Sequence, residues 1–457
     1  MLSQTVSLLL LSCTLLLGVA TTGLAAEAVV VPPTLPGKPL LSNAKLGVFV
    51  HYVHGLTPKD ATGAKLKTID EFADALDVEA LAETAKQAGA EYLIFTTYHA
   101  GIRILYPSKV WGGVFPDKVS RRDVIGELAD AVRKRGMSLV LYVHPNDRHD
   151  LTPLEQQKLI DLGHAESILT GDAIWMEKTG AKQFTGLRGA DAKWNALYFK
   201  QIEELGQRYG SRLAGYWQDG PGPDGVTVRA IMQKYTPNAA IWLNSAASRA
   251  DLPPATLLGG EYIAKPSRKV EDRTSNTCAL QNGITANGDW WASQKTVLYP
   301  PENLFRMTVT MAATKGQEHG GFVLAAGPYA DNSWGPGMLD TLKAHGAWMQ
   351  RFGPAIYGTL PSTAFVTTSH KNQPAWGVAT ESPDGGIVYV HVLRPTAGSR
   401  ELALGKPAGG RKFTAARLLE SKATVQLSQD ASGVTLTLPA GVDWDPLDTV
   451  IVLRATP

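Results

Sequence analysis

The sequence predicts an α/β fold, a (β/α) TIM-like barrel followed by a C-terminal antiparallel β-sandwich. From Leu46 to Phe352, short apolar runs alternate with amphipathic stretches, which is the pattern of parallel strands joined by helices. Beyond Gly358 the helical period disappears, and β-branched segments separated by Gly-rich turns take its place. A doubly wound open sheet is the alternative for the first part, but no Gly-rich phosphate-binding motif follows its first predicted strand.

Seven runs in the first part are interpreted as barrel strands. Each is short, apolar and bounded by polar or turn-forming residues, as expected of strands buried in a parallel sheet. They span Leu46–His51, Tyr92–Tyr98, Ser138–His144, Ala214–Asp219, Ala240–Asn244, Leu257–Ile263 and Phe322–Ala326.

Amphipathic segments between these runs are interpreted as helices. In one of them Val124, Leu128 and Val132 recur at helical spacing, and Gly136 follows two basic residues as a stop signal. The predicted helices span Val78–Ala88, Arg122–Arg135, Trp194–Tyr209, Val226–Tyr235, Asn303–Ala313 and Pro336–Phe352.

The C-terminal part contains strand signals alone. Ile387–Val392, Thr435–Leu438 and Thr449–Leu453 alternate in polarity or are rich in β-branched residues, and turns such as Asp384–Gly386 separate runs of this kind. Residues 359–457 are therefore predicted to form a small antiparallel β-sandwich, and residues 27–358 the barrel.

Residues 1–26 are typical of a secretory signal peptide, because an apolar run from Val6 to Val19 precedes small residues that end at Ala26. We expect export to the periplasm or the extracellular space after cleavage near Ala26. Cys13 lies inside this segment, so the exported chain keeps one cysteine, Cys278, and forms no internal disulfide.

The overall composition argues against two classes of partner. The net charge of +2 favours neither nucleic acid nor an anionic membrane, and no later segment is long and apolar enough to span a bilayer. Eleven Trp are many for a chain of 457 residues, and tryptophan can stack on the apolar face of a sugar. Trp217 and Trp290 are the candidates for that role.

Polar side chains stand at the C-terminal ends of six successive predicted strands, at His51, Tyr98 with His99, His144, Asp219, Asn244 and Glu261. In a (β/α) barrel these ends converge on one mouth, where active sites form. Two carboxylates on separate strands, Asp219 and Glu261, are what a retaining glycosidase needs as nucleophile and acid/base. Sugar hydroxyls would then be bound by His51, Tyr98 and His99, with His144 in the same shell.

Zinc is the alternative use of these groups, because His51, His99, His144 and Asp219 are all of a type that binds it. The nearby His54 is three positions from His51, and on an extended strand the two rings would point in opposite directions. We therefore expect no metal and no other cofactor.

The same segments resemble glycoside hydrolase family 29, the α-L-fucosidases. Four segments are similar to motifs of this family. Leu46–His51 resembles its opening strand, which carries a sugar-binding His, and Glu91–Gly101 resembles its second strand. Trp217-Gln-Asp-Gly220 resembles its nucleophile motif, and Gly260-Glu-Tyr262 resembles the acid/base motif of some members. The resemblance runs from about Leu46 to Thr359, and a C-terminal β-sandwich is also usual in the family.

This resemblance implies hydrolysis of terminal α-L-fucosyl residues of a fucosylated or related glycan through a covalent glycosyl-enzyme. The pocket departs from the family: Tyr98-His99-Ala100-Gly101 replaces His-His-Asp-Gly, and the usual Glu-Trp pair after the first strand is missing. Two alternatives follow, a related barrel glycosidase for another sugar and an inactive sugar-binding homologue.

Overall fold

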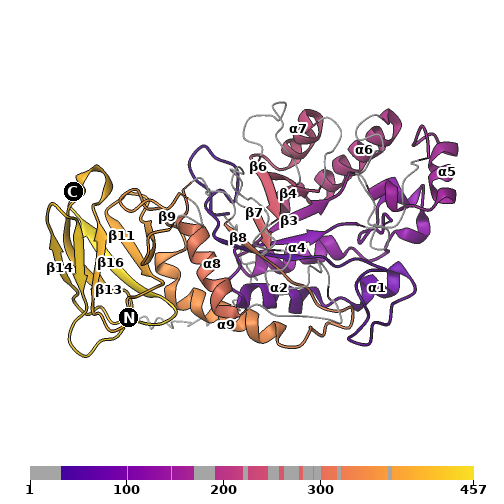
Figure 1. Ribbon diagram of the computed structural model, residues 1–457. Coiled ribbons are helices and arrows are strands. Elements are labelled where there is room, and N and C mark those ends of the chain that lie inside the picture. Colours follow the sequence, from indigo (N-terminus) through magenta and orange to yellow (C-terminus); the bar gives the residue numbers. More distant parts are fainter. Residues whose placement is uncertain are drawn as a thin grey trace, which may run out of the picture.

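The structure is a computed structural model, and it describes residues 32–99, 101–145, 147–168, 191–219, 225–244, 257–261, 277–280, 292, 300–315, 321–368 and 373–456. The predicted signal peptide lies outside these ranges. Within them, no helix has the length and apolar character needed to cross a membrane. A parallel sheet with surrounding helices forms one part of the molecule, and two antiparallel sheets form the other (Figure 1).

Eight parallel strands pair in chain order, and the last pairs with the first, so the sheet closes into a barrel. Seven of them agree with the predicted runs to within two residues at either end. The eighth, β7, is not predicted, because its four residues Thr-Cys-Ala-Leu are too few for a period to show. The strands are β1 (Leu46–Val50), β2 (Tyr92–Thr96), β3 (Ser138–Val143), β4 (Leu213–Gln218), β5 (Ala240–Asn244), β6 (Leu257–Glu261), β7 (Thr277–Leu280) and β8 (Phe322–Ala325).

Helices surround this sheet, and all six predicted ones are present to within two residues. Aspartates cap three of them: Asp77, Asp123 and Asp191 each accept a hydrogen bond from a backbone N–H of the first turn. The helices are α1 (Ile69–Ala75), α2 (Val78–Gln87), α3 (Lys109–Gly112), α4 (Val124–Lys134), α5 (Pro153–Asp161), α6 (Ala192–Tyr209), α7 (Gly225–Tyr235), α8 (Pro301–Ala313) and α9 (Met338–Phe352), with the single turns η1 (Pro116–Lys118), η2 (Asp147–Asp150), η3 (Gly210–Arg212) and η4 (Gly353–Ala355).

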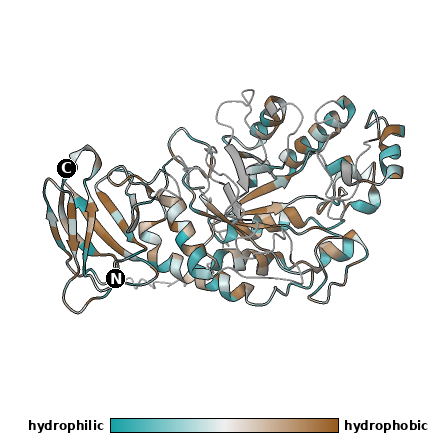
Figure 2. Cartoon of the chain, in the orientation of Figure 1, coloured by the Kyte–Doolittle hydropathy of each residue, from teal (hydrophilic) through white to brown (hydrophobic). Residues whose placement is uncertain are grey.

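Side chains alternate between the inside of the barrel and its helical shell. Aromatic residues such as Phe49, Tyr142 and Trp217 fill the inside, whereas their strand neighbours pack against the helices. Gly47 makes room for this core, since a Cβ there would lie 2.4 Å from the ring of Tyr92. The barrel strands accordingly consist mainly of apolar residues, whereas hydrophilic residues lie on the outer faces of the helices (Figure 2).

The C-terminal part consists of a five-stranded sheet in the order β13-β16-β11-β10-β9 and a three-stranded sheet in the order β12-β15-β14. Val390 and Leu453 of the first sheet share one apolar cluster with Leu402 and Leu436 of the second, as in the predicted sandwich. The elements are β9 (Leu360–Pro361), β10 (Gly377–Glu381), β11 (Ile387–Val392), β12 (Glu401–Gly405), η5 (Ala408–Gly410), β13 (Phe413–Leu418), β14 (Gln426–Gln429), β15 (Val434–Thr437) and β16 (Thr449–Ala455).

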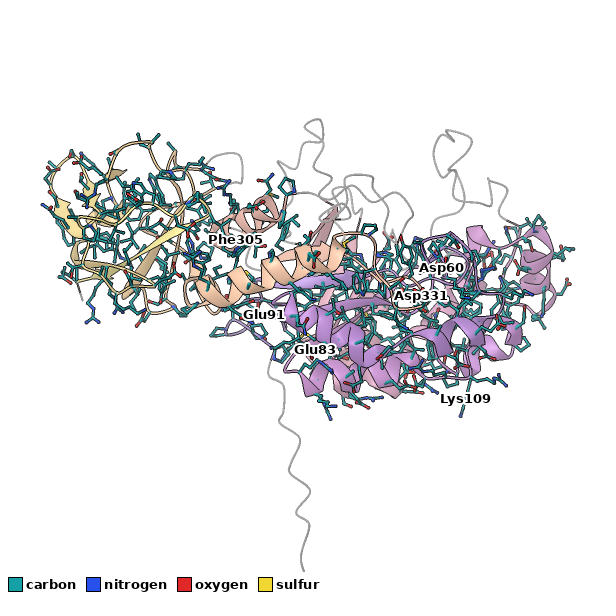
Figure 3. All side chains as sticks on the ribbon, turned by 90° about the horizontal axis from the view of Figure 1, so that it is seen from below. Asp60, Glu83, Glu91, Lys109, Phe305 and Asp331 are labelled. Atoms are coloured by element: carbon teal, nitrogen blue, oxygen red, sulfur yellow. The ribbon has the colours of Figure 1, made fainter. Side chains whose placement is uncertain are left out.

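Helices α8 and α9 join the two parts. The guanidinium of Arg351 on α9 forms a 2.5 Å ion pair with Glu420 beyond β13. The buried His391 of β11 places its Nε2 3.2 Å from the carbonyl oxygen of Ala355 in η4. Phe305 on α8 lies on the side of the barrel nearest the C-terminal sheets (Figure 3). Polar contacts therefore connect α9 and η4 to the C-terminal sheets.

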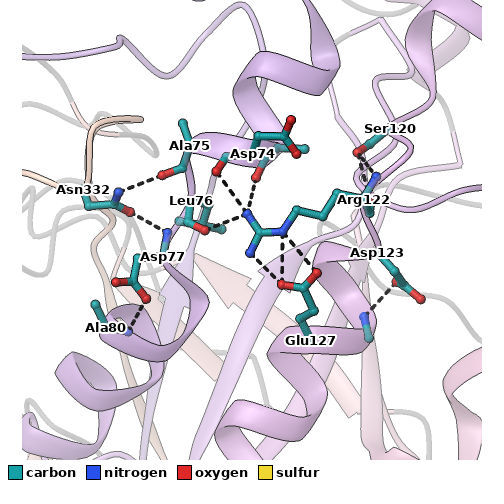
Figure 4. A network of polar contacts seen from close by, with 12 residues as sticks. Asp74, Ala75, Leu76, Asp77, Ala80, Ser120, Arg122, Asp123, Glu127 and Asn332 are labelled. Carbon is teal, nitrogen blue, oxygen red and sulfur yellow. Dashed lines mark hydrogen bonds and ion pairs between the residues drawn. The ribbon is translucent and has the colours of Figure 1, made fainter.

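Arg122 connects α1 to α4 at the end of the barrel where strands lead into helices (Figure 4). Its Nη1 donates to the carbonyl oxygen of Ala73 in the last turn of α1 at 2.7 Å and to that of Leu76, just beyond this helix, at 2.9 Å. Its Nη2 donates to Glu127 at 2.6 Å. One guanidinium thus terminates α1 and fixes it to α4.

We predict that Arg122→Ala lowers the free energy of unfolding by about 2–3 kcal/mol, because several charge-assisted hydrogen bonds disappear at once. Arg121→Ala is the matched control: that side chain is 86% exposed and its ion pair with Asp70 contributes little. Urea unfolding of both variants tests this, and equal losses would contradict it.

Glu91, at the start of β2, gives the fold a dependence on pH. Burial raises the pKa of its carboxyl to about 7, although the backbone N–H of Lys45 donates to it at 2.6 Å. In the unfolded chain the carboxyl titrates near 4.5. Between these values the folded state holds the proton more tightly than the unfolded state, so this contribution to stability is lost as pH rises.

Glu91→Gln should therefore gain stability relative to the parent protein between pH 4.5 and pH 8, by on the order of 2–3 kcal/mol. Glu83, labelled with Glu91 in Figure 3, provides the control. A hydrogen bond from Arg135 lowers the pKa of Glu83, so Glu83→Gln should show no such drift above pH 5. Chemical unfolding across this pH range measures both, and parallel curves for the two variants would refute the assignment.

Candidate active site

Four of the predicted residues follow their strands directly or closely, on the side of the barrel where the strands end: His51 after β1, His99 after β2, His144 after β3 and Asp219 after β4. The alternation of the strands directs them. His51 lies two positions beyond Phe49, and Asp219 two positions beyond Trp217, and both of these rings point into the barrel. The same face continues into the mouth, so the polar residues form the next layer above the aromatic core.

Asp219 is the accessible carboxylate of this layer. Its backbone N–H donates to the carbonyl oxygen of Val143 at 2.9 Å, which extends the strand pairing by one residue. Its Oδ2 accepts a hydrogen bond of 2.7 Å from the hydroxyl of Tyr142. The Asp219 side chain is 25% exposed, so a ligand in the mouth can reach it.

Tyr142 is a site residue that the sequence analysis does not identify. Burial, with the nearby charges of Asp219 and Asp147, raises its pKa well above the usual range, so the hydroxyl stays protonated and donates to Asp219. Because Tyr142 lies in the apolar run of β3, the sequence pattern predicts that its ring belongs to the core. The available signal is its position, two residues before His144 and therefore on the same face.

His51 is buried beside two of these groups. Its ring centroid lies 5.1 Å from that of Tyr142 and 6.2 Å from that of His99. Burial, and then the neighbouring His99, hold the pKa of His51 well below its usual value. A neutral imidazole has one donor and one acceptor nitrogen, which suits the hydroxyl groups of a sugar.

Asp147 is the second residue missed by the sequence analysis. It begins η2 and is fully buried, at 0% exposure. Its Oδ1 accepts from Nδ1 of His99 at 3.0 Å and lies 3.2 Å from Nδ1 of His144. The two imidazole rings stack at 5.3 Å over this shared carboxylate. Nothing in the local sequence indicates a contact with a histidine 48 positions earlier.

Tyr98 and Trp217 lie beneath the mouth. The hydroxyl of Tyr98 donates to the carbonyl oxygen of His144 at 2.9 Å and accepts from its N–H at 3.2 Å, so it fixes the backbone after β3. The ring of Trp217 packs at 5.4 Å from Phe49 inside the barrel. The predicted contacts of Tyr98 and Trp217 with sugar stay predictions.

Glu261 is the last residue of β6, and its backbone pairs with Ala279 of β7. It therefore stands at the same end of the sheet as Asp219, with β5 between their strands. Asn244 likewise ends β5. Trp290 lies outside the described residues.

The zinc alternative can be compared with this geometry. Among the described residues, the ligand atoms of His99, His144 and Asp147 lie within 4.8 Å of one another. Compared with the four residues considered for zinc from the sequence, this set contains Asp147 and lacks His51 and Asp219. The contacts from the two imidazole nitrogens to Asp147 are at hydrogen-bond distance, so hydrogen bonding alone accounts for the cluster.

Comparison with known proteins gives one consistent family. The family model described as alpha-L-fucosidase matches residues 66–354. The tissue alpha-L-fucosidase of Bos taurus is 30% identical over 427 residues, which are 82% of each chain. That of Mus musculus is 25% identical over 353 residues, 71% of this chain and 68% of the relative.

Solved structures of such proteins share the fold. An alpha-L-fucosidase of Bacteroides thetaiotaomicron superimposes with a TM-score of 0.64 at 18% identity, covering 93% of this chain and 97% of that one. A second structure from this bacterium, described as a trapped covalent intermediate with 2-fluoro-fucosyl fluoride, gives 0.64 at 19% identity and covers 93% and 99%. The Thermotoga maritima alpha-fucosidase in complex with fucose gives 0.59 at 16% identity and covers 92% and 99%.

Proposed function

This chain belongs to the α-L-fucosidase family, glycoside hydrolase family 29, and on that basis we propose that it is a retaining exo-glycosidase acting on terminal α-L-fucosyl residues of a glycan. The observation that carries the proposal is the accessible carboxylate of Asp219 at the end of β4, oriented by the hydroxyl of Tyr142. The trapped covalent intermediate of the related Bacteroides enzyme supports retention.

In the first step, the Asp219 carboxylate bonds to the anomeric carbon of the sugar while the bond to the leaving oxygen breaks. Glu261 gives its proton to that oxygen. In the second step Glu261 takes a proton from water, the water oxygen bonds to the anomeric carbon, and Asp219 departs as a carboxylate. Both carboxyl groups then return to their starting forms, and no cofactor takes part.

The strand register supports this pairing of acids. Gln218 is level with Leu243 of β5, and Leu243 is level with Leu258 of β6. Glu261 therefore lies two residues further along its strand than the register partner of Asp219, with one strand between them. A retaining mechanism requires the two carboxyl groups to lie about 5 Å apart.

The sugar is bound by the histidines of the mouth. In this proposal His51 and His99 exchange hydrogen bonds with its hydroxyl groups, and His144, whose ring is a neighbour of His99, belongs to the same shell. Trp290 stays a candidate stacking surface, as does Trp217. Export after cleavage near Ala26 would bring the enzyme to extracellular or periplasmic fucosylated glycans.

One observation favours a second candidate, a glycosidase for another sugar. At the tip of β2 the sequence has Tyr98 and Ala100 where the family usually has a His and an Asp, and the Tyr98 hydroxyl is bonded to the backbone of His144. This part of the pocket therefore presents fewer polar atoms to the substrate than the family pattern does.

A panel of nitrophenyl glycosides separates the two candidates. We expect hydrolysis of the α-L-fucoside with a kcat/KM well above that of every other sugar, and release of α-L-fucose as the first product by NMR. A preference for a different sugar would select the second candidate. No turnover of any glycoside would leave sugar binding as the function.

Asp219→Gly should abolish turnover and keep the fold, because removal of a covalent nucleophile costs on the order of 10⁴-fold or more in rate. Azide fits the vacated space and should restore product as a glycosyl azide of inverted configuration. Thermal unfolding checks that the variant is folded. Turnover near that of the parent protein would show that Asp219 is not the nucleophile.

Glu261→Ala should depend on the leaving group. An aryl glycoside with an acidic phenol needs little proton donation, so its first step should persist, whereas a natural sugar leaving group should react very slowly. The basic limb of the pH–rate profile should also disappear. If good and poor leaving groups slow equally and both limbs remain, the acid lies elsewhere, and Glu271 is the next residue to replace.

A further inference from the structure

We propose that Asp147 is a positioning residue for the second half of the reaction: it holds His144 as a cation beside Asp219, where that cation stabilises the carboxylate as it leaves the glycosyl-enzyme. This inference rests on the proposed function and on Asp219 as nucleophile. No motif of the sequence indicates it. It comes from the contacts of a buried carboxylate with two histidines of different strands.

His144 lies between two carboxylates. Its Nδ1 is 3.2 Å from Oδ1 of Asp147, and its Nε2 is 4.0 Å from Oδ2 of Asp219. A neutral imidazole has a lone pair on one nitrogen, which would then face an anionic oxygen. Protonation of both nitrogens removes that repulsion and gives each carboxylate a positive partner. The geometry therefore favours the imidazolium form of His144.

His144 has a carboxylate near each ring nitrogen, whereas His99 has Asp147 at Nδ1 and the neutral hydroxyl of Tyr142 3.5 Å from Nε2, so the negative charge around His144 is greater. His99 stacks on His144 with ring centroids 5.3 Å apart, so two cations there would repel each other. His99 can remain neutral and still donate its Nδ1–H to Asp147. Within the described part of the chain, the other titratable groups that face this cluster are His51, Tyr98, Tyr142, Tyr198 and Asp219.

The effect of a His144 cation on the reaction barrier differs between the two chemical steps. In the first, Asp219 begins as a full anion and loses charge as its oxygen bonds to the anomeric carbon, so a nearby cation stabilises the starting state at least as much as the transition state. In the second, Asp219 begins as a neutral ester and regains charge as that bond breaks. Only there does the cation favour the transition state over the state before it.

Asp147→Asn tests this with an aryl fucoside whose leaving group is good. We expect kcat to fall on the order of 10- to 100-fold and KM to fall with it, while kcat/KM stays within about threefold, because the glycosyl-enzyme now accumulates. A pre-steady-state burst of phenol and detection of the covalent adduct by mass spectrometry check that accumulation. A loss of kcat/KM with unchanged KM and no burst would overturn the proposal.

His144→Gln and the double variant show whether Asp147 acts through His144. The double variant should be no slower than His144→Gln alone, whereas independent roles would multiply the two losses. His99→Gln is the matched control, since it contacts the same carboxylate: it should lower kcat/KM through a lost sugar contact and produce no burst.

A measurement on the parent protein covers the case in which Asp147→Asn does not fold. Nitrogen-15 NMR of histidine-labelled enzyme at pH 7 should show both ring nitrogens of His144 protonated, and a single protonated nitrogen would overturn the proposal. Stoichiometric zinc that restores activity after chelation would also overturn it, because the cluster would then be a metal site.

The two proposals can fail separately. If Asp219→Gly keeps its activity or azide restores nothing, the proposed mechanism fails and takes this inference with it. If azide restores activity to Asp219→Gly but Asp147→Asn gives no burst, only the role of Asp147 is refuted.

Discussion

Closure of the parallel sheet, with its period-two alternation of side chains, determines which groups can meet at the mouth of this barrel. Once β1 pairs with β8, every inward position becomes part of a closed layer. The rings of Phe49 and Trp217 occupy such a layer, and the residues two positions later, His51 and Asp219, must occupy the next. The chemistry of the mouth therefore depends on strand register as much as on residue type.

The charged groups at the two ends of the barrel are treated differently. At the mouth, Asp147 is buried against the imidazole rings of His99 and His144, which lie within hydrogen-bond distance of its carboxylate. At the opposite end, Glu91 is met by the backbone N–H of Lys45, and burial disfavours its anionic form. The first arrangement orients functional groups, and the second imposes a cost on stability at neutral pH. This division agrees with the separation of function and stability between the faces of such barrels.

The sequence predicts this fold well because long periodic segments identify it, and it predicts the site only partly. Strand ends reveal His51, His144 and Asp219, since position along the chain fixes them. Asp147 is invisible in the sequence because its partner His99 belongs to another strand, and side-chain pairing of that kind exists only once the sheet has closed. For Tyr142 the sequence predicts a core position, because this tyrosine lies within an apolar run. Only the structure shows that its hydroxyl donates to Asp219.

The junction at α8 and α9 makes the C-terminal sheets a part of the catalytic body and not an appendage. Helix α9 packs on the barrel through one face and is anchored beyond β13 through Arg351, while η4 meets His391 of β11. Thermal unfolding of one part should then unfold the other as well, so a calorimetric scan should show a single cooperative transition.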